Sequence, residues 1–298
     1  MLDTNQLYFH RWWPLVGGIA AATVSVAVGT WWWYRAPPAG KAVESKTFDI
    51  KETTLKAPSE WVPVAKVSSI FIYPVKSTHA VSVQEAICTP HGLKSGSIRD
   101  RVFMVIDENH KFVSGKVLPK LVLVSSKLEG DTLYLSAPGQ ESLIVNLKEV
   151  EQENNIITCR MRADDIDGLD LGNKVSEWLT AFACPSEVGI ESLHIVYHYR
   201  NQSTRKWEES EAFPLLKASD NSFYADMTAG MLLSEGSVED LNSRLKSNLS
   251  GISVGKGVTP LHFRPNILVS ECEPYAEDQW KWMRIGEVIM RQTGPCSR

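Results

Sequence analysis

Cationic and polar residues recur at the ends of predicted strands, where they could bind an anion together. Lys76 and Ser77 follow a predicted strand that ends at Val75. Arg101 begins the next strand, and Arg264 begins a later one beside a proline. A guanidinium binds phosphate through two N–H groups, and a lysine adds a point charge. Each residue alone is more typical of a solvated strand end, so convergence on one ligand is a hypothesis that spacing cannot test.

Other familiar chemistries are not indicated. The sequence contains no H-E-x-x-H, G-x-S-x-G or G-x-G-x-x-G motif. Gly251 to Gly257 is similar to a phosphate-binding loop but is one residue short and has no Ser or Thr after its lysine, which favours a surface loop. His194 and His198 lie in a predicted β segment, where a histidine is more often a packed residue than a ligand.

Composition excludes several classes of protein. The chain has 298 residues with 31 Lys and Arg against 35 Asp and Glu, so its charge of -4 does not indicate nucleic-acid binding. The five cysteines form no C-x-x-C pair and one must stay unpaired. We therefore expect neither a disulfide framework nor a structural zinc site, and a reducing compartment fits best.

One segment near the N-terminus predicts a membrane anchor. Residues 12–34 carry no formal charge and have tryptophans near both ends. As a helix they would measure roughly 35 Å, enough to cross a hydrocarbon core, and the tryptophans suit the two interfaces. A buried core helix or a cleaved signal peptide is the alternative. The positive charges after the segment place the bulk of the chain in the cytosol.

The rest of the chain is predicted to be mostly β, in the α+β class. A short segment (1–11), the transmembrane helix (12–34) and a linker (35–62) precede two β-rich domains, 63–185 and 186–298. Strands are predicted over 67–75, 101–106, 121–128, 132–136, 143–147, 193–199, 263–270 and 285–291. Helices are predicted over 174–183 and 237–246, the second opened by a capping box of Ser237 and Asp240.

Five fragments carry a resemblance to a known family. They are Tyr73-Pro-Val-Lys-Ser77, Arg99-Asp-Arg101, Phe263-Arg-Pro-Asn-Ile267, Tyr275-Ala-Glu-Asp-Gln-Trp280 and Cys296-Ser-Arg298. In this order they resemble the MOSC family, and within it the mitochondrial amidoxime-reducing components, which are molybdenum enzymes. The resemblance runs from about Val64 to Arg298. It implies a MOSC N-terminal β-barrel domain and a MOSC β-barrel domain behind the anchor helix.

The resemblance also implies the site. Six residues would hold the pterin and phosphate of the molybdenum cofactor, and two more would lie beside the metal. The first group is Lys76, Ser77, Arg101, Thr228, Arg264 and Asn266, and the second is Ser297 and Arg298. In the family, the cysteine whose thiolate binds molybdenum follows the position of Arg298, where this sequence stops. We therefore expect a truncated form that lacks its metal ligand and in which no catalytic residue is assigned; the resemblance implies a molybdenum-dependent reductase for the complete chain.

The implied reaction is the reduction of N-hydroxylated compounds such as amidoximes and hydroxylamines. Its electrons would come from NADH through a flavin reductase and a b-type cytochrome at the outer mitochondrial membrane. One alternative is a carrier that binds the molybdenum cofactor without reacting. Another is a sulfurase-like protein associated with pyridoxal phosphate, which is disfavoured because the sequence has no room for the large transferase domain.

Overall fold

The computed structural model describes residues 7–9, 56–184, 189–200, 205, 215–217, 220, 222–248, 257–294 and 296. Residues 1–10 and 57–298 form one compact unit. The predicted membrane segment 12–34, most of the linker, the loop 251–256 and the pair Ser297 and Arg298 lie outside the described residues. In the described part, no helix has the length and apolar character needed to span a membrane.

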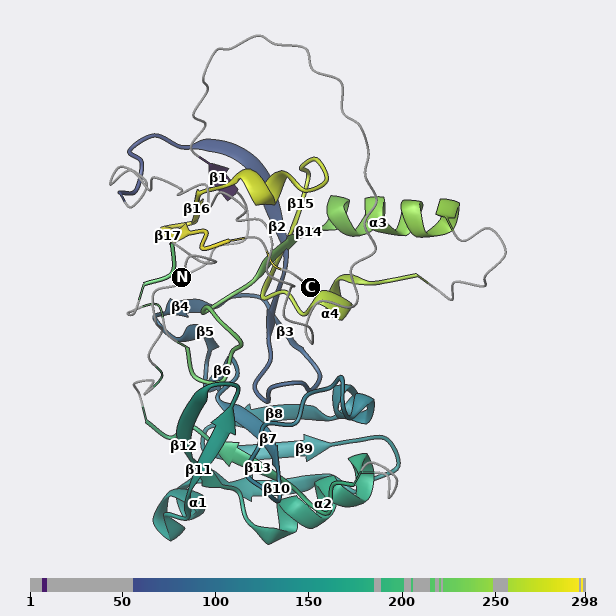
Figure 1. Ribbon diagram of the computed structural model, residues 1–298. Helices are drawn as coiled ribbons and strands as arrows, with labels where there is room; N and C mark the ends of the chain where they lie inside the picture. The colour runs from purple at the N-terminus through teal and green to yellow at the C-terminus, as the bar shows by residue number, and fades with distance from the viewer. Residues whose placement is uncertain are drawn as a thin grey trace, which may run out of the picture. The chain divides into compact units, whose positions relative to one another are not determined.

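A seven-stranded sheet is built around the long strand β2 (Val62–Ile72). Its buried residues include Val67, Ile70 and Ile72, which turn toward the core while their neighbours are more exposed. β2 pairs antiparallel with β15 (Ile267–Ser270) and with two short strands, as Figure 1 lets the reader follow. The other strands of this sheet are β1 (Leu7–Phe9), β3 (Val81–Val83), β14 (Leu232–Ser234), β16 (Trp282–Ile285) and β17 (Val288–Arg291).

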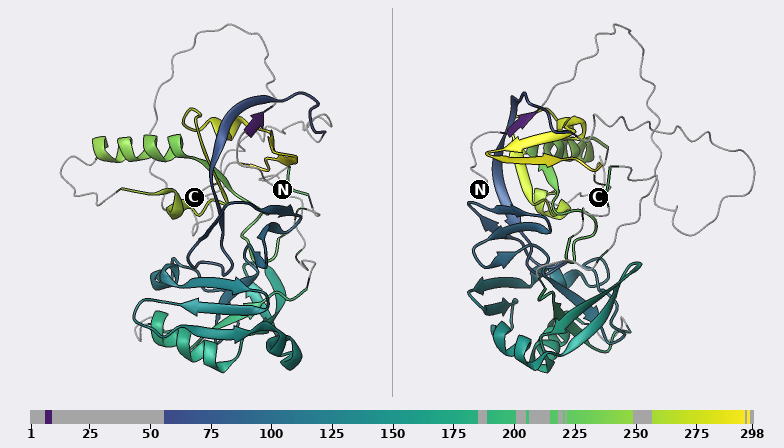
Figure 2. Two further views of the ribbon diagram at one scale, coloured as in Figure 1. Left: turned by 180° about the vertical axis from the view of Figure 1, so that it is seen from behind. Right: turned by 90° about the vertical axis from the view of Figure 1, so that its left-hand side faces the viewer.

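Three smaller sheets complete the β structure. Figure 2 shows the teal strands together at one end of the described unit and the yellow strands at the other. The first small sheet contains β4 (Ile87–Thr89), β5 (Gly92–Ser95) and β6 (Ile98–Arg99). The second contains β8 (Ser125–Glu129), β9 (Thr132–Ser136) and β10 (Leu143–Asn146). The third contains β7 (Phe103–Asp107), β11 (Ile156–Met161), β12 (Asp164–Asp170) and β13 (Leu193–Tyr197).

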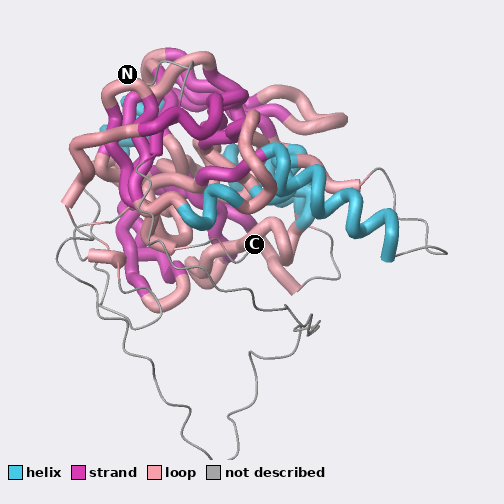
Figure 3. Tube along the Cα trace, turned by 90° about the horizontal axis from the view of Figure 1, so that it is seen from above, coloured by secondary structure: helices cyan, strands magenta, loops and turns pink. Residues whose placement is uncertain are grey.

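The helices are few and mostly short. α2 (Asn173–Ala183) lies where a helix is predicted, with Val175 and Leu179 in the core. Figure 3 shows α3 (Glu235–Asn248) running outward from the strands. The remaining helical elements are η2 (Pro119–Leu123), α1 (Leu147–Glu153), α4 (Pro260–Phe263) and η4 (Ala276–Gln279).

Two local predictions are corrected. α3 begins before Ser237, because the Ser234 hydroxyl accepts from the Ser237 N–H at 3.1 Å and so acts as the N-cap. The Ser237 hydroxyl instead donates to Glu277 at 2.7 Å. The strand predicted from Leu121 begins only at Ser125, because Pro119 starts a 3-10 turn in front of it.

The pairing of strands runs across the domain boundary predicted near residue 185. β13 follows that boundary, yet it pairs antiparallel with β7. β2 precedes the boundary and pairs with β15. The prediction of a mostly β protein is confirmed, and strands from the two predicted domains pair with each other in two of the sheets.

Candidate functional site

Two predicted site residues meet on one aromatic ring. Tyr73 follows β2, Arg101 lies between β6 and β7, and Arg264 ends α4. The Arg101 guanidinium carbon is 4.8 Å from the centroid of the Tyr73 ring, and that of Arg264 is 4.2 Å from it. An aromatic face attracts cations, so it offsets part of the repulsion between the two guanidiniums. The arrangement concentrates positive charge where an anion would be stabilised.

Asn266 connects this pair to the rest of the site. Its side-chain oxygen accepts from Arg101 Nη1 at 3.0 Å and from the Met231 N–H at 3.2 Å. Its side-chain nitrogen donates to Asp100 Oδ1 at 2.9 Å and to the Phe71 carbonyl at 3.1 Å. The residue is 0% exposed. Asn266 therefore fixes the positions of three chain segments that are far apart in the sequence.

Lys76 is buried, although a lysine at the end of a strand is usually exposed to solvent. Its ammonium group donates to the Tyr224 carbonyl and to Asp226 Oδ1, both at 2.7 Å, and lies 4.7 Å from the centroid of the Phe112 ring. The residue is 4% exposed. Burial lowers the pKa of Lys76 to about 7, although Asp226 acts to raise it. Lys76 therefore changes charge near neutral pH.

Three predicted site residues have left-handed backbone. The φ angle is 74° at Ser77, 48° at Arg101 and 59° at Arg264. This region is costly for residues other than glycine, and such residues gather at sites that bind ligands. The turns that carry these side chains are therefore held by the surrounding structure.

Four predicted site residues remain. The structure describes Ser77 and Thr228, whereas Ser297 and Arg298 lie outside the described residues. The Ser77 carbonyl packs against Gly115, where an added Cβ would lie 3.5 Å from it. Thr228 lies on the segment 222–231 and donates to the Gly230 carbonyl at 3.4 Å.

Residues of the site that sequence reasoning missed are mainly the partners of its cations. Asp100 binds Arg101 and accepts from the Tyr73 N–H at 2.8 Å. Asp226 binds Lys76, and Arg162 Nη2 lies 3.3 Å from the same carboxylate oxygen. Asp100 lies inside the fragment Arg99-Asp-Arg101, and Asp226 lies two positions before Thr228. Their closeness in the sequence to predicted site residues is the signal that could have found them.

The donor set fits a phosphate-bearing cofactor. Lys76, Arg101 and Arg264 supply more positive charge than the neighbouring Asp100 and Asp226 remove. Charge-assisted hydrogen bonds from guanidinium and ammonium groups are the usual way to hold a phosphate. Among the described residues, no group of three or more His, Cys, Asp or Glu side chains could hold a metal ion directly.

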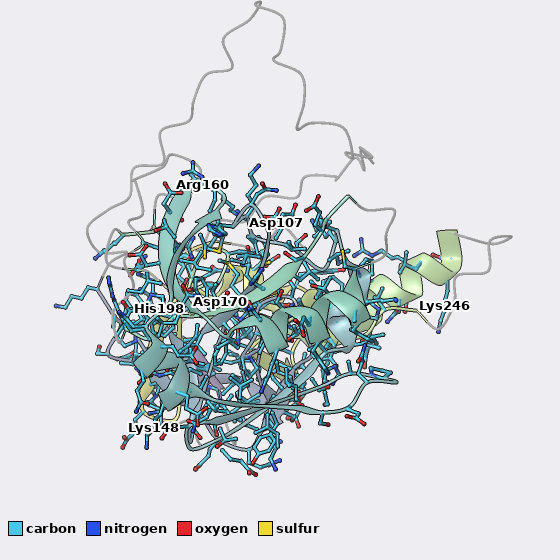
Figure 4. The ribbon with its side chains drawn as sticks, turned by 90° about the horizontal axis from the view of Figure 1, so that it is seen from below. Asp107, Lys148, Arg160, Asp170, His198 and Lys246 are labelled. Carbon is cyan, nitrogen blue, oxygen red and sulfur yellow. The ribbon has the colours of Figure 1, made fainter. Side chains whose placement is uncertain are left out.

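His198 is packed against the segment 222–231. It is 2% exposed, and Figure 4 labels it among the packed side chains. Its ring lies 4.6 Å from that of Phe223, and the His91 ring lies 4.9 Å from the same ring. Burial lowers the pKa of His198 to about 4, so it is neutral at physiological pH. Both histidines therefore support Phe223.

A second cluster has the residue types of a hydrolytic triad. His194 Nδ1 is 3.0 Å from Asp170 Oδ2, and its Nε2 is 3.4 Å from the Ser192 hydroxyl. The Glu108 carboxylate, however, accepts from the N–H groups of Glu191 and Ser192 at 3.1 and 3.4 Å. An acyl-transfer site needs N–H donors for a developing oxyanion, and a carboxylate there opposes it. The cluster serves to join β12 to the start of β13.

Comparisons with known proteins show which family the chain is similar to. Residues 64–186 match the MOSC N-terminal beta barrel domain, and residues 220–298 match the MOSC domain. The chain is 36% identical to mitochondrial amidoxime-reducing component 1 of Homo sapiens, over 79% of this chain and 65% of that protein. The protein of the same name from Danio rerio is 38% identical over 79% of this chain and 67% of its own length. The protein of the same name from Mus musculus is 32% identical over 95% of this chain and 73% of its own length.

The chain spans about two thirds of the length of these curated relatives, and 65% of the human protein. Among solved structures, the solution structure of a Bordetella bronchiseptica protein is 19% identical, with a TM-score of 0.29. That match covers 37% of this chain and 87% of the other, and it is too distant to bear on the site.

Proposed function

Because the chain belongs to the MOSC family, in which its matched relatives are named mitochondrial amidoxime-reducing components, we propose that it is a molybdenum-dependent oxidoreductase. Its substrates would be N-hydroxylated compounds such as amidoximes and hydroxylamines. The observation that carries the proposal is the meeting of Arg101 and Arg264 on the Tyr73 ring. Pyridoxal phosphate finds no support in the matched domains.

The chain's residues would hold the cofactor by charge and by fixed geometry. Arg101 and Arg264 would bind its phosphate, with Asn266 keeping Arg101 in place at 3.0 Å. Lys76 would add a positive charge whose protonation depends on pH near neutrality. When bound, the molybdenum cofactor supplies the metal centre for transfer of an oxygen atom and two electrons. The protein would supply position and electrostatic stabilisation.

We propose the partners and location on the basis of the resemblance. Electrons would pass from NADH to a flavin reductase, then to a b-type cytochrome, and then to this protein. The segment 12–34 would anchor the chain in the outer mitochondrial membrane with its folded part in the cytosol. Confining the partners to one surface would raise their effective concentration.

The test uses the full chain produced in cells that make the molybdenum cofactor. Molybdenum and pterin are measured per chain, and NADH-driven reduction of benzamidoxime is measured with the cytochrome and reductase supplied. We expect molybdenum and pterin to be lost in the double variant Lys76→Ala, Arg264→Ala and retained in Arg160→Ala, whose side chain is 51% exposed, with the reduction rate following the cofactor content. Full cofactor content in the double variant would refute the site. Bound cofactor without reduction in the unmodified chain would favour the carrier.

A further inference from the structure

Arg205 lies in a part of the sequence that suggested no function, yet the residue is only 4% exposed. Its Nε donates to Asp164 Oδ2 at 3.0 Å. Its other nitrogens donate to the Ser222 hydroxyl at 3.4 Å, to the Ala225 carbonyl and to the Asp226 carbonyl at 3.4 Å. One side chain therefore binds three residues of the segment 222–226.

The same segment also holds Lys76. The Lys76 ammonium donates to the Tyr224 carbonyl and to the Asp226 carboxylate, both at 2.7 Å. Tyr224 lies between Ser222 and Ala225, which Arg205 binds, and Arg205 also binds the Asp226 carbonyl. A shift of this segment would move both partners of Lys76 at once. A main-chain contact also holds the segment, since the Tyr224 N–H donates to the Arg101 carbonyl at 3.0 Å.

We propose that Arg205 is a positioning residue, which holds the segment 222–226 so that Tyr224 and Asp226 fix Lys76 in the cofactor site. The inference rests on the proposed function for the identity of the ligand. The contacts of Arg205 and Lys76 with the segment 222–226 are present without any ligand. A planar guanidinium is needed because one rigid fork must reach several acceptors. A lysine in its place would keep the charge and reach fewer of them.

Electrostatics support this role. Burial lowers the pKa of Arg205, and the neighbouring Asp164 carboxylate opposes that shift. Bringing a guanidinium into the interior costs free energy, which its hydrogen bonds must offset. A buried charge of this kind can set the position of a chain segment because it tolerates few alternative arrangements.

The test compares Arg205→Lys with the control Arg160→Lys in the full chain. Arg160 also bonds a carbonyl and an aspartate, at 3.0 and 2.8 Å, and lies at the outer part of β11 in Figure 4. Hydrogen exchange is followed by mass spectrometry in peptides covering 222–231, 70–79 and 125–136. Reaction of Lys76 with an amine-directed reagent is followed in the same samples, and molybdenum content is measured separately.

We expect exchange at 222–231 and 70–79 to be about tenfold faster in Arg205→Lys, with 125–136 unchanged, because local opening becomes easier. Lys76 should react faster, and molybdenum content should fall. Equal acceleration of all three peptides, or unchanged reaction of Lys76, would overturn the proposal. If the unmodified chain holds no molybdenum, the proposed function fails, while the exchange and labelling results still decide the role of Arg205.

A second variant guards against failure of Arg205→Lys to fold. Asp164→Asn removes the charge of the carboxylate that Arg205 Nε binds and leaves the guanidinium in place. We expect smaller changes in the same two peptides and in the labelling of Lys76. Exchange equal to that of the unmodified chain in both peptides would count against the proposal.

Discussion

The side-chain oxygen of Asn266 lies 3.0 Å from Arg101 Nη1, although 165 positions separate the two residues. Arg101 belongs to the region that matches the MOSC N-terminal domain, and Asn266 belongs to the region that matches the MOSC domain. The site therefore exists only where the two matched regions meet.

Asn266→Asp tests this connection. The new carboxylate would face Asp100 Oδ1 in place of an N–H donor that now lies 2.9 Å from it. We expect the free energy of unfolding to fall by about 3 kcal/mol at neutral pH, because two buried carboxylates repel and a donor is lost. The pKa of the new carboxyl would be raised in the folded state, so stability should recover as the pH falls through it. Urea unfolding at two pH values measures the effect.

The control for that variant is Asn146→Asp. Asn146 caps α1 by accepting from the Lys148 N–H at 3.1 Å, and an aspartate does this equally well. Its amide also donates to Glu149 at 3.0 Å, so this variant brings two carboxylates together at an exposed position. Its free energy of unfolding should stay within about 0.5 kcal/mol of the original. An equal loss in both variants would mean that the contacts of Asn266 have no special weight.

Lys76→Met separates ligand binding from stability. We expect molybdenum content to fall by about tenfold, since a charge-assisted contact is lost. The free energy of unfolding should not fall, because the variant no longer buries an ammonium group and Asp226 keeps Arg162 at 3.3 Å. Metal analysis and urea unfolding measure the two quantities, with Lys148→Met, whose side chain is 68% exposed, as the control.

The lowered pKa of Lys76 determines how the stability change in Lys76→Met depends on pH. Below about pH 7 the lysine is charged in both the folded and the unfolded state, so the cost of burying it is fully present. As the pH rises toward the ordinary pKa of 10.5, that cost disappears. Any gain in stability from Lys76→Met should therefore be largest at low pH. A gain that grows with pH would contradict this assignment.

Cofactor retention should also depend on pH. As the pH rises through about 7, Lys76 loses its proton and its attraction for a phosphate, so the affinity for the cofactor should fall by about tenfold in total, as in Lys76→Met. Asp226→Asn removes the carboxylate that raises the pKa of Lys76, so the fall should begin at lower pH. Molybdenum retained after dialysis over a pH series measures both. Identical curves for the two proteins would show that Asp226 does not control Lys76.

Gly168 and Tyr224 form a pair suited to a double-variant cycle. A Cβ added at Gly168 would lie 2.5 Å from the Tyr224 hydroxyl and 3.0 Å from Val196 Cβ. That hydroxyl is buried and has no hydrogen-bond partner among the described residues. Gly168→Ala should lower the free energy of unfolding by about 2 kcal/mol, and Tyr224→Phe should raise it by about 1 kcal/mol.

Combining the two changes should recover most of the loss, because the hydroxyl that meets the new methyl group is gone. Thermal unfolding of the four proteins gives the coupling. If the two changes in the free energy of unfolding are strictly additive, the new methyl group at position 168 clashes with Val196 and not with the Tyr224 hydroxyl.

Local patterns in the sequence are sufficient to predict the class of fold and the order of its motifs. Alternating apolar residues along β2 and the helical spacing of Val175 and Leu179 are local patterns, and local patterns follow from backbone geometry. The resemblance to the MOSC family also follows from the residues of five fragments and their order along the chain. The family matches confirm this resemblance.

Which charged side chains contact one another depends on long-range folding. The contacts of Lys76 with Tyr224 and Asp226 join residues 148 and 150 positions apart, and that between Asn266 and Asp100 spans 166. No local preference specifies such pairs, because their free energy comes from burial that exists only after the sheets have formed. For the same reason the role of Arg205 was invisible in the sequence: a buried guanidinium and a solvated one are written with the same residue.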